Sequence, residues 1–286
     1  MLFKNRRKLR VLFSLFTSLL LFLVIFVSGP VMSLESSDSA KNLVPALLNN
    51  ADVRTSLSNK IVDQVGKGTD PLITMSIKSK RAAFVSAISG ELSSPTIIQE
   101  LQKDVGLAYG FVTTSEPSIT IQVKPLFASL ISAMSKVDPL FENGKKVLKD
   151  IEPVTLTRDA STPGIGKWLS YARNLYVALI LLLAISLFFF LRFSANGKRA
   201  LRGIGTKVLS VGVLAIAQFL AIEIIASKFA AKATDSTIRT VIPVAARELF
   251  SYYQSIGIAL VVLGAVAILI ATRLKTPTAR IDQLPE

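Results

Sequence analysis

The chain has 286 residues, 51% of them hydrophobic, and a formal net charge of +14. It contains no cysteine and no histidine, which excludes a Ser-His-Asp triad, a cysteine nucleophile, a His-ligated haem and a Cys/His zinc site. Catalysis by carboxylates or by a Ser-Lys pair remains compatible with this composition. No motif, however, predicts a catalytic residue, a cofactor or a metal.

The first predicted element is an apolar segment, residues 11–30, which follows a basic tail, residues 1–10. The hydrocarbon core of a bilayer, about 30 Å thick, needs roughly 20 apolar residues in a helix. A segment in lipid must satisfy its own backbone hydrogen bonds, so a helix is predicted. We interpret it as an uncleaved signal anchor; a signal peptide cleaved near Ser33 is the alternative.

A hydrophilic domain, residues 34–167, comes next, and its first half has the periodicity of helices. After a polar linker, residues 34–39, Asn50 or Asp52 is placed to cap a helix. Two more helices are predicted, one from Pro71 to about Leu92 and one after Pro95. The residues predicted to face inward are Val53, Leu57, Ile61, Val65, Phe84, Ile88, Leu92, Ile97 or Ile98, Leu101 and Val105.

The second half of the domain has a different period. Alternation of apolar and polar residues predicts two short strands: Ile119, Ile121 and Val123 in the first, Val154 and Leu156 in the second. Between them a helix is predicted from Pro125 to about Asp138. The two strands could pair, with the helices covering the sheet, so we expect an α-rich α+β domain.

Three further apolar segments predict transmembrane helices at residues 168–192, 208–227 and 252–272. A basic loop, residues 193–207, and a second loop, residues 228–251, connect them, and a tail, residues 273–286, follows. The predicted fold class is therefore a membrane α-helical protein with four transmembrane helices plus an extracytoplasmic α+β domain.

The positive charge lies on short segments rather than on the domain. Residues 1–10 and 192–207 each hold five basic residues and no acid, whereas residues 34–167 hold 15 bases and 14 acids. We expect the chain to lie in the plasma membrane. The positive-inside rule then predicts that both termini and the 193–207 loop are in the cytoplasm. Residues 34–167 and 228–251 are then outside. Because no single domain carries a basic face, nucleic acid is not an expected partner.

Some segments resemble a known group of proteins. These are the helix DVRTSLSNKIVDQV, the strand–helix unit ITIQVKPLFASLISAM, and the short strand IEPVTL ahead of the three closing membrane helices. Together they resemble actinobacterial four-helix integral membrane proteins of unknown function with a large extracytoplasmic domain. The resemblance implies this architecture and no activity or site residue.

Glu223 is an acid inside a predicted membrane helix, where a carboxylate is expensive and needs a partner. Arg173 is predicted at a similar depth, so we expect a Glu223–Arg173 ion pair, with Lys228 as a weaker partner. An interfacial carboxylate facing water and a proton or cation relay are the alternatives. Gln218 is expected to form a hydrogen bond between helices.

Small and aromatic residues suggest how the membrane helices pack. Contact between helices, or with a second chain, is expected at Gly212, Ala217, Ala221, Gly257, Gly264, Ala267 and Ala271. An interfacial aromatic belt is expected at Trp168, Tyr171, Tyr176, Tyr252 and Tyr253. Two basic clusters are expected to be solvated or to contact anionic lipid or a wall polymer: Lys78, Lys80 and Arg81, and Lys145, Lys146 and Lys149.

The leading functional hypothesis is a non-enzymatic membrane protein whose exported domain binds or positions a component of the cell envelope or of a membrane complex. A subunit of an oligomeric transporter or channel using Glu223 and Gln218 is the first alternative. A sensor that relays to a cytoplasmic partner is the second. Expected partners are the lipid bilayer and either another protein or further copies of the chain.

Overall fold

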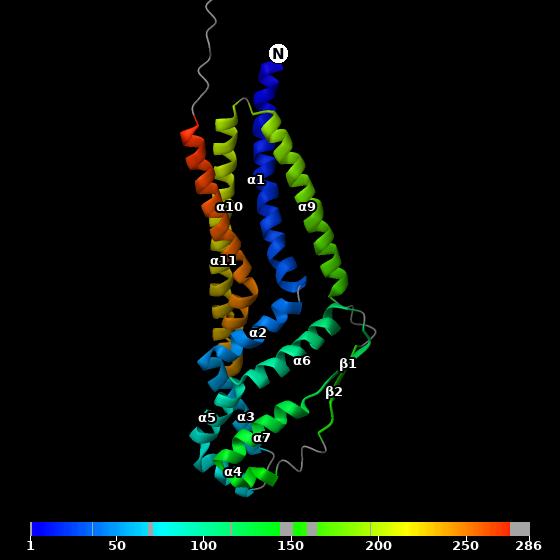
Figure 1. Ribbon diagram of the computed structural model, residues 1–286, viewed down its shortest axis with the longest axis vertical. Helices are drawn as coiled ribbons and strands as arrows, with labels where there is room; N and C mark the ends of the chain where they lie inside the picture. Colours follow the sequence, from blue (N-terminus) through cyan, green and yellow to red (C-terminus); the bar gives the residue numbers. More distant parts are fainter. Residues whose placement is uncertain are drawn as a thin grey trace, which may run out of the picture. The chain divides into compact units, whose positions relative to one another are not determined.

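The computed structural model describes residues 2–35, 37–67, 71–114, 116–143, 151–158, 165–194 and 196–274. Four of its helices are long and apolar enough to cross a membrane (Figure 1). They are α1 (Leu2–Glu35), α9 (Gly166–Arg192), α10 (Gly197–Ala231) and α11 (Ser236–Arg273). Four such helices are the signature of a multi-pass membrane protein.

Most residues in the apolar parts of these helices are not buried inside the protein. Only 17% to 28% of the residues in the four most apolar windows are buried. Leu181 of α9 and Leu263 of α11, for example, are each 60% exposed. Leaving such surface in water costs about 25 cal/mol per Å², so lipid is the medium that suits it.

The chain divides into two compact units, and α10 and α11 contribute residues to both. The first unit consists of Met1–Pro30, Ala172–Phe219 and Tyr252–Glu286. Within it, Leu20 and Val24 of α1 pack with Leu179 of α9. The rings of Phe13 and Phe189 stack with their centroids 5.2 Å apart and strengthen the same helix contact.

The second unit consists of Val31–Tyr171 and Leu220–Ser251. It holds α2 (Ser37–Asn49), α3 (Ala51–Lys67), α4 (Pro71–Ser79), α5 (Arg81–Leu92), α6 (Pro95–Thr113), α7 (Lys124–Val137) and the 3₁₀ helix η1 (Pro139–Asn143). Helix α2 packs on α6, and α5 packs on both α3 and α7. The unit has its own apolar core, in which Val62, Phe84 and Ile88 are completely buried. Phe84 packs edge-on against Phe141 of η1, at 5.0 Å.

Two of the helix starts predicted in this unit, after Asn50 and at Pro95, are confirmed by their caps. The Asn50 side chain accepts hydrogen bonds from the backbone N–H groups of Asp52, at 3.0 Å, and Val53, at 3.1 Å. Ser94 caps α6 in the same way through Ile97 N–H, at 3.3 Å, with Pro95 in the first turn. The residues predicted to face inward on α3, α5 and α6 all pack in or against the core.

Three loop predictions were wrong. The 34–39 linker falls largely in helices, with α1 reaching Glu35 and α2 starting at Ser37. The 193–207 loop is mostly the first turns of α10, and the 228–251 loop is mostly helix, leaving residues 232–235 as the link. The reason is that Lys, Arg and Ala are good helix formers, so the backbone stays helical beyond the apolar run. The single helix predicted at 71–92 is also two helices, separated at Lys80 by non-helical backbone (φ −112°, ψ 22°).

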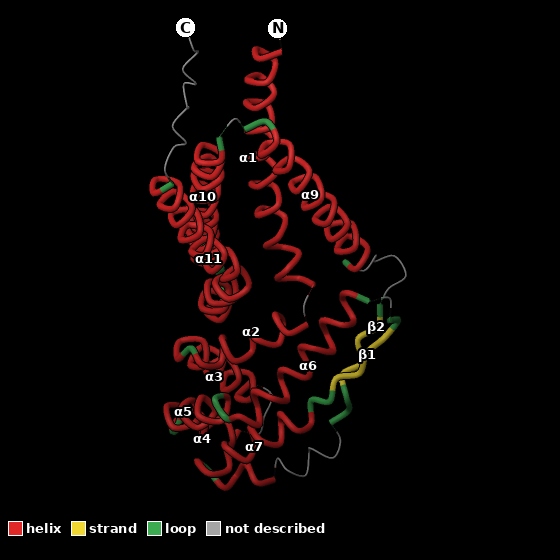
Figure 2. The backbone as a smooth tube through the Cα atoms, turned by 45° about the horizontal axis from the view of Figure 1, so that its top comes forward, coloured by secondary structure: helices red, strands yellow, loops and turns green. Residues whose placement is uncertain are grey.

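The two predicted strands exist and pair, although Val123, predicted in the first strand, instead precedes α7. Strand β1 (Ser118–Ile121) runs antiparallel to β2 (Val154–Thr157), from Ser118 opposite Thr157 to Ile121 opposite Val154 (Figure 2). Every residue of β2 is exposed and only Ile119 of β1 is buried, so the helices do not cover the sheet as expected. The sheet is held instead by Arg158, which donates hydrogen bonds to the carbonyls of Phe111 and Thr114 at the end of α6. A cation there also suits the negative end of the helix dipole.

The link between α10 and α11 is bonded to the helical domain within the second unit. Asp235 caps α11 through Thr237 N–H, at 2.8 Å, and forms an ion pair with Lys60 of α3. Ser56 donates a further hydrogen bond to the Thr237 hydroxyl, at 3.3 Å. The Lys60 ammonium and the Thr237 N–H lower the pKa of Asp235. The end of α10 and the start of α11 are therefore part of the second unit's structure and not a separate loop.

Candidate functional site

Glu223 has a partner that the sequence did not predict. Its carboxylate lies 3.5 Å from the guanidinium Nε of Arg247 on α11. Arg247 falls in the segment predicted as a loop, so it was not considered. The predicted partner Arg173 belongs to the other compact unit, and that pairing stays a prediction. Gln218 is half-buried on α10.

The Glu223–Arg247 pair lines a groove of about 490 Å³ between α10 and α11. Its remaining walls are Ile224, Ser227, Lys228, Pro243 and Val244. The Glu223 side chain is 32% exposed and that of Arg247 is 71% exposed. Both side chains therefore reach the surface of the protein, and the pair joins α10 to α11.

Close packing of α10 and α11 rests on four glycines in antiparallel register. A methyl group added at Gly212 would lie 2.7 Å from Val261 N and 2.8 Å from Gly257 O. About two helical turns away, a methyl group added at Gly205 would lie 2.9 Å from Gly264 O. The residues in each helix are seven apart, so both pairs lie on one face. Gly205 falls in the segment predicted as the 193–207 loop, so the sequence did not predict this role in packing.

The other small residues divide into two groups. Ala271 is buried, and Ala267 lies close to Gly205, where an added methyl group would be 3.1 Å from the Ala267 Cβ. Ala217 and Ala221 are both exposed on α10. Their contact with a second chain stays a prediction.

The aromatic belt residues differ in their surroundings. Trp168 and Tyr171 are about 70% exposed, at 72% and 68%, and are free to lie at a membrane interface. Tyr176 and Tyr252 are half-buried. Tyr253 is buried, and its hydroxyl donates a hydrogen bond of 2.7 Å to the carbonyl of Phe26 on α1. Its ring occupies the space that any side chain at Gly29 would need, so Tyr253 joins two helices.

A polar cluster inside the first unit was not predicted, because Lys207 had been assigned to a loop. Lys207 of α10 donates hydrogen bonds to the hydroxyls of Ser14, at 2.6 Å, and Ser18, at 3.1 Å, both on α1. Its ammonium lies 5.5 Å from the ring centroid of Phe190 on α9. We call these four residues the Lys207 cluster. Next to it, the hydroxyls of Thr17 and Ser186 share a buried hydrogen bond of 2.7 Å.

The basic cluster at the start of α5 is bonded within the domain. Lys80 lies 2.9 Å from the carboxylate of Asp138, and Arg81 lies 2.5 Å from that of Asp63. Lys78 is exposed. The second predicted basic cluster, Lys145, Lys146 and Lys149, lies outside the described residues.

Ser76 and Lys80 resemble a catalytic pair only superficially. The Ser76 hydroxyl donates to Asp138 Oδ2 at 2.5 Å, while Leu140 N–H donates to Oδ1 at 3.0 Å. Hydrogen bonds from Ser76, Leu140 N–H and Lys80 lower the pKa of Asp138 to about 2. A carboxylate with so low a pKa is a poor base for activating a serine. The group instead fastens α4 to η1.

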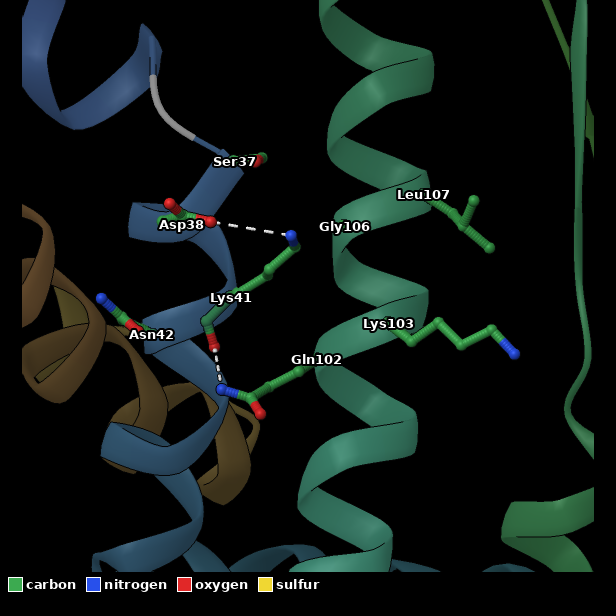
Figure 3. Close-up of a pocket in the computed structure, with 8 residues that line it drawn as sticks. All are labelled: Ser37, Asp38, Lys41, Asn42, Gln102, Lys103, Gly106 and Leu107. Atoms are coloured by element: carbon green, nitrogen blue, oxygen red, sulfur yellow. Dashed lines mark hydrogen bonds and ion pairs between the residues drawn. The ribbon is translucent and has the colours of Figure 1, made fainter.

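A polar groove of about 650 Å³ lies between α2 and α6 (Figure 3). Lys41 and Gln102 project into the space between the two helices, and Gln102 Nε2 donates to Lys41 O at 3.4 Å. Asp38 lies 3.6 Å from the Lys41 ammonium. A methyl group at Gly106 would meet the Lys41 Cε at 2.8 Å, so the missing side chain there makes room for the lysine. The rest of the lining is Ser37, Asn42, Lys103 and Leu107.

Comparison with known proteins gives no functional assignment. No protein-family model, no curated protein and no solved structure matches the chain. Among the described residues no three acidic side chains gather where they could hold a metal ion. Functional inference therefore rests on the side chains described above.

Proposed function

We propose that the chain is a non-enzymatic multi-pass membrane protein that presents its helical domain outside the cytoplasm to bind a protein partner. The positive-inside rule supports this orientation, because the segments 1–10 and 192–207 are strongly basic and the domain is nearly neutral. The groove between α2 and α6 is the partner site.

The composition of the groove carries the proposal. Six of its eight lining residues are polar or charged, and both signs of charge are present. Asp38 and Lys41 form an ion pair of 3.6 Å, and the Asp38 side chain is 81% exposed, so this pair can be exchanged for contacts with a partner at little cost. Protein interfaces carry direct hydrogen bonds and a polar rim, and these side chains can supply both.

The domain is also joined to the end of α10 and the start of α11, which belong to the same unit. Bonds from Lys60 and Ser56 to the 235–237 segment fasten α3 to those helices within the second unit. Where Ser76, Lys80 and Asp138 meet, the serine is not activated as a nucleophile, because Asp138 is a weak base. These two observations favour positioning over catalysis.

The test is site-specific photocrosslinking in native membranes. A photoreactive amino acid at Asn42, in the groove, should give one adduct of discrete mass, and the same residue at Ala83, exposed on α5, should give none. Gly106→Leu fills the groove and should abolish the adduct. Gly110→Leu, on the same helix with open space around it, should leave the adduct unchanged.

Equal crosslinking at Asn42 and Ala83, or an adduct that survives Gly106→Leu, would overturn the assignment of the groove. An adduct with the mass of two copies of this chain would replace the partner by a homo-oligomer. That result would favour the transporter alternative.

A further inference from the structure

We propose that the Lys207 cluster binds the phosphate group of an anionic phospholipid. The site lies on the first unit, where α1, α9 and α10 contribute Ser14 and Ser18, Phe190, and Lys207 respectively. It is distinct from the α2–α6 groove, which belongs to the second unit.

The cluster leaves the lysine with unused bonding capacity. An ammonium group has three N–H donors, and Ser14 and Ser18 accept two of them. The Ser18 hydroxyl donates its own proton to Ser14 O at 3.0 Å, so it acts only as an acceptor toward the lysine. Lys207 is partly exposed, which leaves its third N–H for an acceptor from outside the protein.

The charge of Lys207 has no carboxylate to balance it within the described part of its unit. Residues 2–30, 172–194, 196–219 and 252–274 contain no aspartate and no glutamate. A lysine charge among apolar helices is costly unless an anion or water compensates it. Serine hydroxyls and an aromatic face stabilise the ammonium but carry no net negative charge. Any counter-charge therefore comes from outside these residues.

The position of the lysine matches a lipid headgroup. Lys207 lies ten residues into α10, or about 15 Å from its start, and the same end carries Lys198, Arg199 and Arg202. A helical side chain leans toward the N-terminus of its helix, which here is this basic end. A lysine placed so extends its ammonium toward the headgroup region while its stem stays in apolar surroundings.

Apolar surface beside the cluster favours a lipid over a free anion. Leu15, next to Ser14, is 67% exposed, and Leu19, next to Ser18, is 54% exposed. An acyl chain can cover these side chains while its phosphate contacts the lysine. Inorganic phosphate would make only the charged contact.

The experiment measures thermal unfolding of the full chain in a neutral detergent with added phosphatidylglycerol, phosphatidylcholine or inorganic phosphate. Binding to the folded state raises the unfolding midpoint in proportion to the logarithm of ligand concentration. Phosphatidylglycerol should raise the midpoint of the wild type, and phosphatidylcholine should not. Lys207→Gln and the double variant Ser14→Ala/Ser18→Ala should each lose most of this rise, and circular dichroism would verify that each is folded.

Two controls make the result specific. Arg199→Gln removes an exposed basic residue from the same end of α10 and should keep the full rise. Asp282 and Glu286 are the acids of the 273–286 tail, in the part outside the described residues, and Asp282→Asn/Glu286→Gln should also keep the full rise. An equal rise in Lys207→Gln, or no rise in the wild type, would overturn the proposal. An equal rise with inorganic phosphate would replace the lipid by a free anion.

Discussion

Replacing Gly212 by alanine should push α10 and α11 apart. The added methyl group would lie 2.7 Å from Val261 N, 2.8 Å from Gly257 O and 2.9 Å from Leu260 Cβ. Carbon contacts are most favourable near 3.5–4.0 Å, so the helices must separate locally by about 0.8 Å. Two of the three obstructing atoms are backbone atoms, which cannot turn aside as a flexible side chain could.

The expected magnitude is set by two opposing effects. Overpacking a well-packed interface costs about 1–3 kcal/mol, while glycine to alanine in a helix gains up to about 1 kcal/mol. Gly197→Ala, at the first position of the same helix, has no atom within 4 Å of the new methyl group and so serves as the variant without a clash. Gly212→Ala should therefore be less stable than Gly197→Ala by about 1–3 kcal/mol.

The assay is thermal unfolding of the detergent-solubilised protein, followed by circular dichroism. One kcal/mol shifts the midpoint by roughly 2–4 °C in proteins of 150–250 residues. Gly257→Ala removes the same close approach from the other helix and should cost a similar amount. The double variant should fall short of the sum, because the two sites touch. Equal midpoints for Gly212→Ala and Gly197→Ala would show that the helices do not meet at these glycines.

Three further predictions concern other contacts. Tyr253→Phe loses the hydrogen bond to Phe26 O and should cost about 0.6 kcal/mol, as membrane hydrogen bonds do; an unchanged unfolding midpoint would contradict that bond. Asp235→Ala removes a helix cap and an ion pair, and Lys60→Ala only the ion pair, so hydrogen exchange at residues 236–240 should quicken more in the first variant. Asp138 has a folded pKa of about 2, below its unfolded value of about 3.9, so it stabilises the fold fully above pH 4 and loses this effect as pH falls toward 2. Asp138→Asn should make the unfolding midpoint less sensitive to acid in that window, but not insensitive, because Asp63 and Asp235 also have lowered pKa values; an acid profile identical to that of the wild type would refute the role of Asp138.

Local sequence signals predicted much of the fold. The apolar runs predicted the four long helices because lipid demands length and composition together. Asn50, Ser94 and Pro95 predicted helix starts because a cap is a contact between residues two or three apart. Alternation at Ile119 and Leu156 predicted strands, although it could not show that most of the sheet is exposed.

The contacts between helices could not be predicted in the same way. Apolarity marks where a helix can lie in lipid and not where the helix ends, so Lys207 and Arg247 were assigned to loops. Because both residues were predicted in loops, the sequence could not predict that they contact Glu223 and Ser14. Tyr253 is a residue type typical of an aromatic belt. Only its position opposite Gly29, known from the structure, shows that it is buried.

The orientation of the domain is the claim on which the proposed function depends most. The natural chain has no cysteine, so Asn42→Cys in the α2–α6 groove and Gly197→Cys at the start of α10 each introduce a single thiol. Both positions are exposed, and an impermeant thiol reagent applied to intact cells reports which of them is outside. The proposal predicts labelling of Asn42→Cys alone, with Gly197→Cys labelled only after the cells are opened. Labelling of Gly197→Cys in intact cells while Asn42→Cys is spared would place the groove in the cytoplasm and contradict the account.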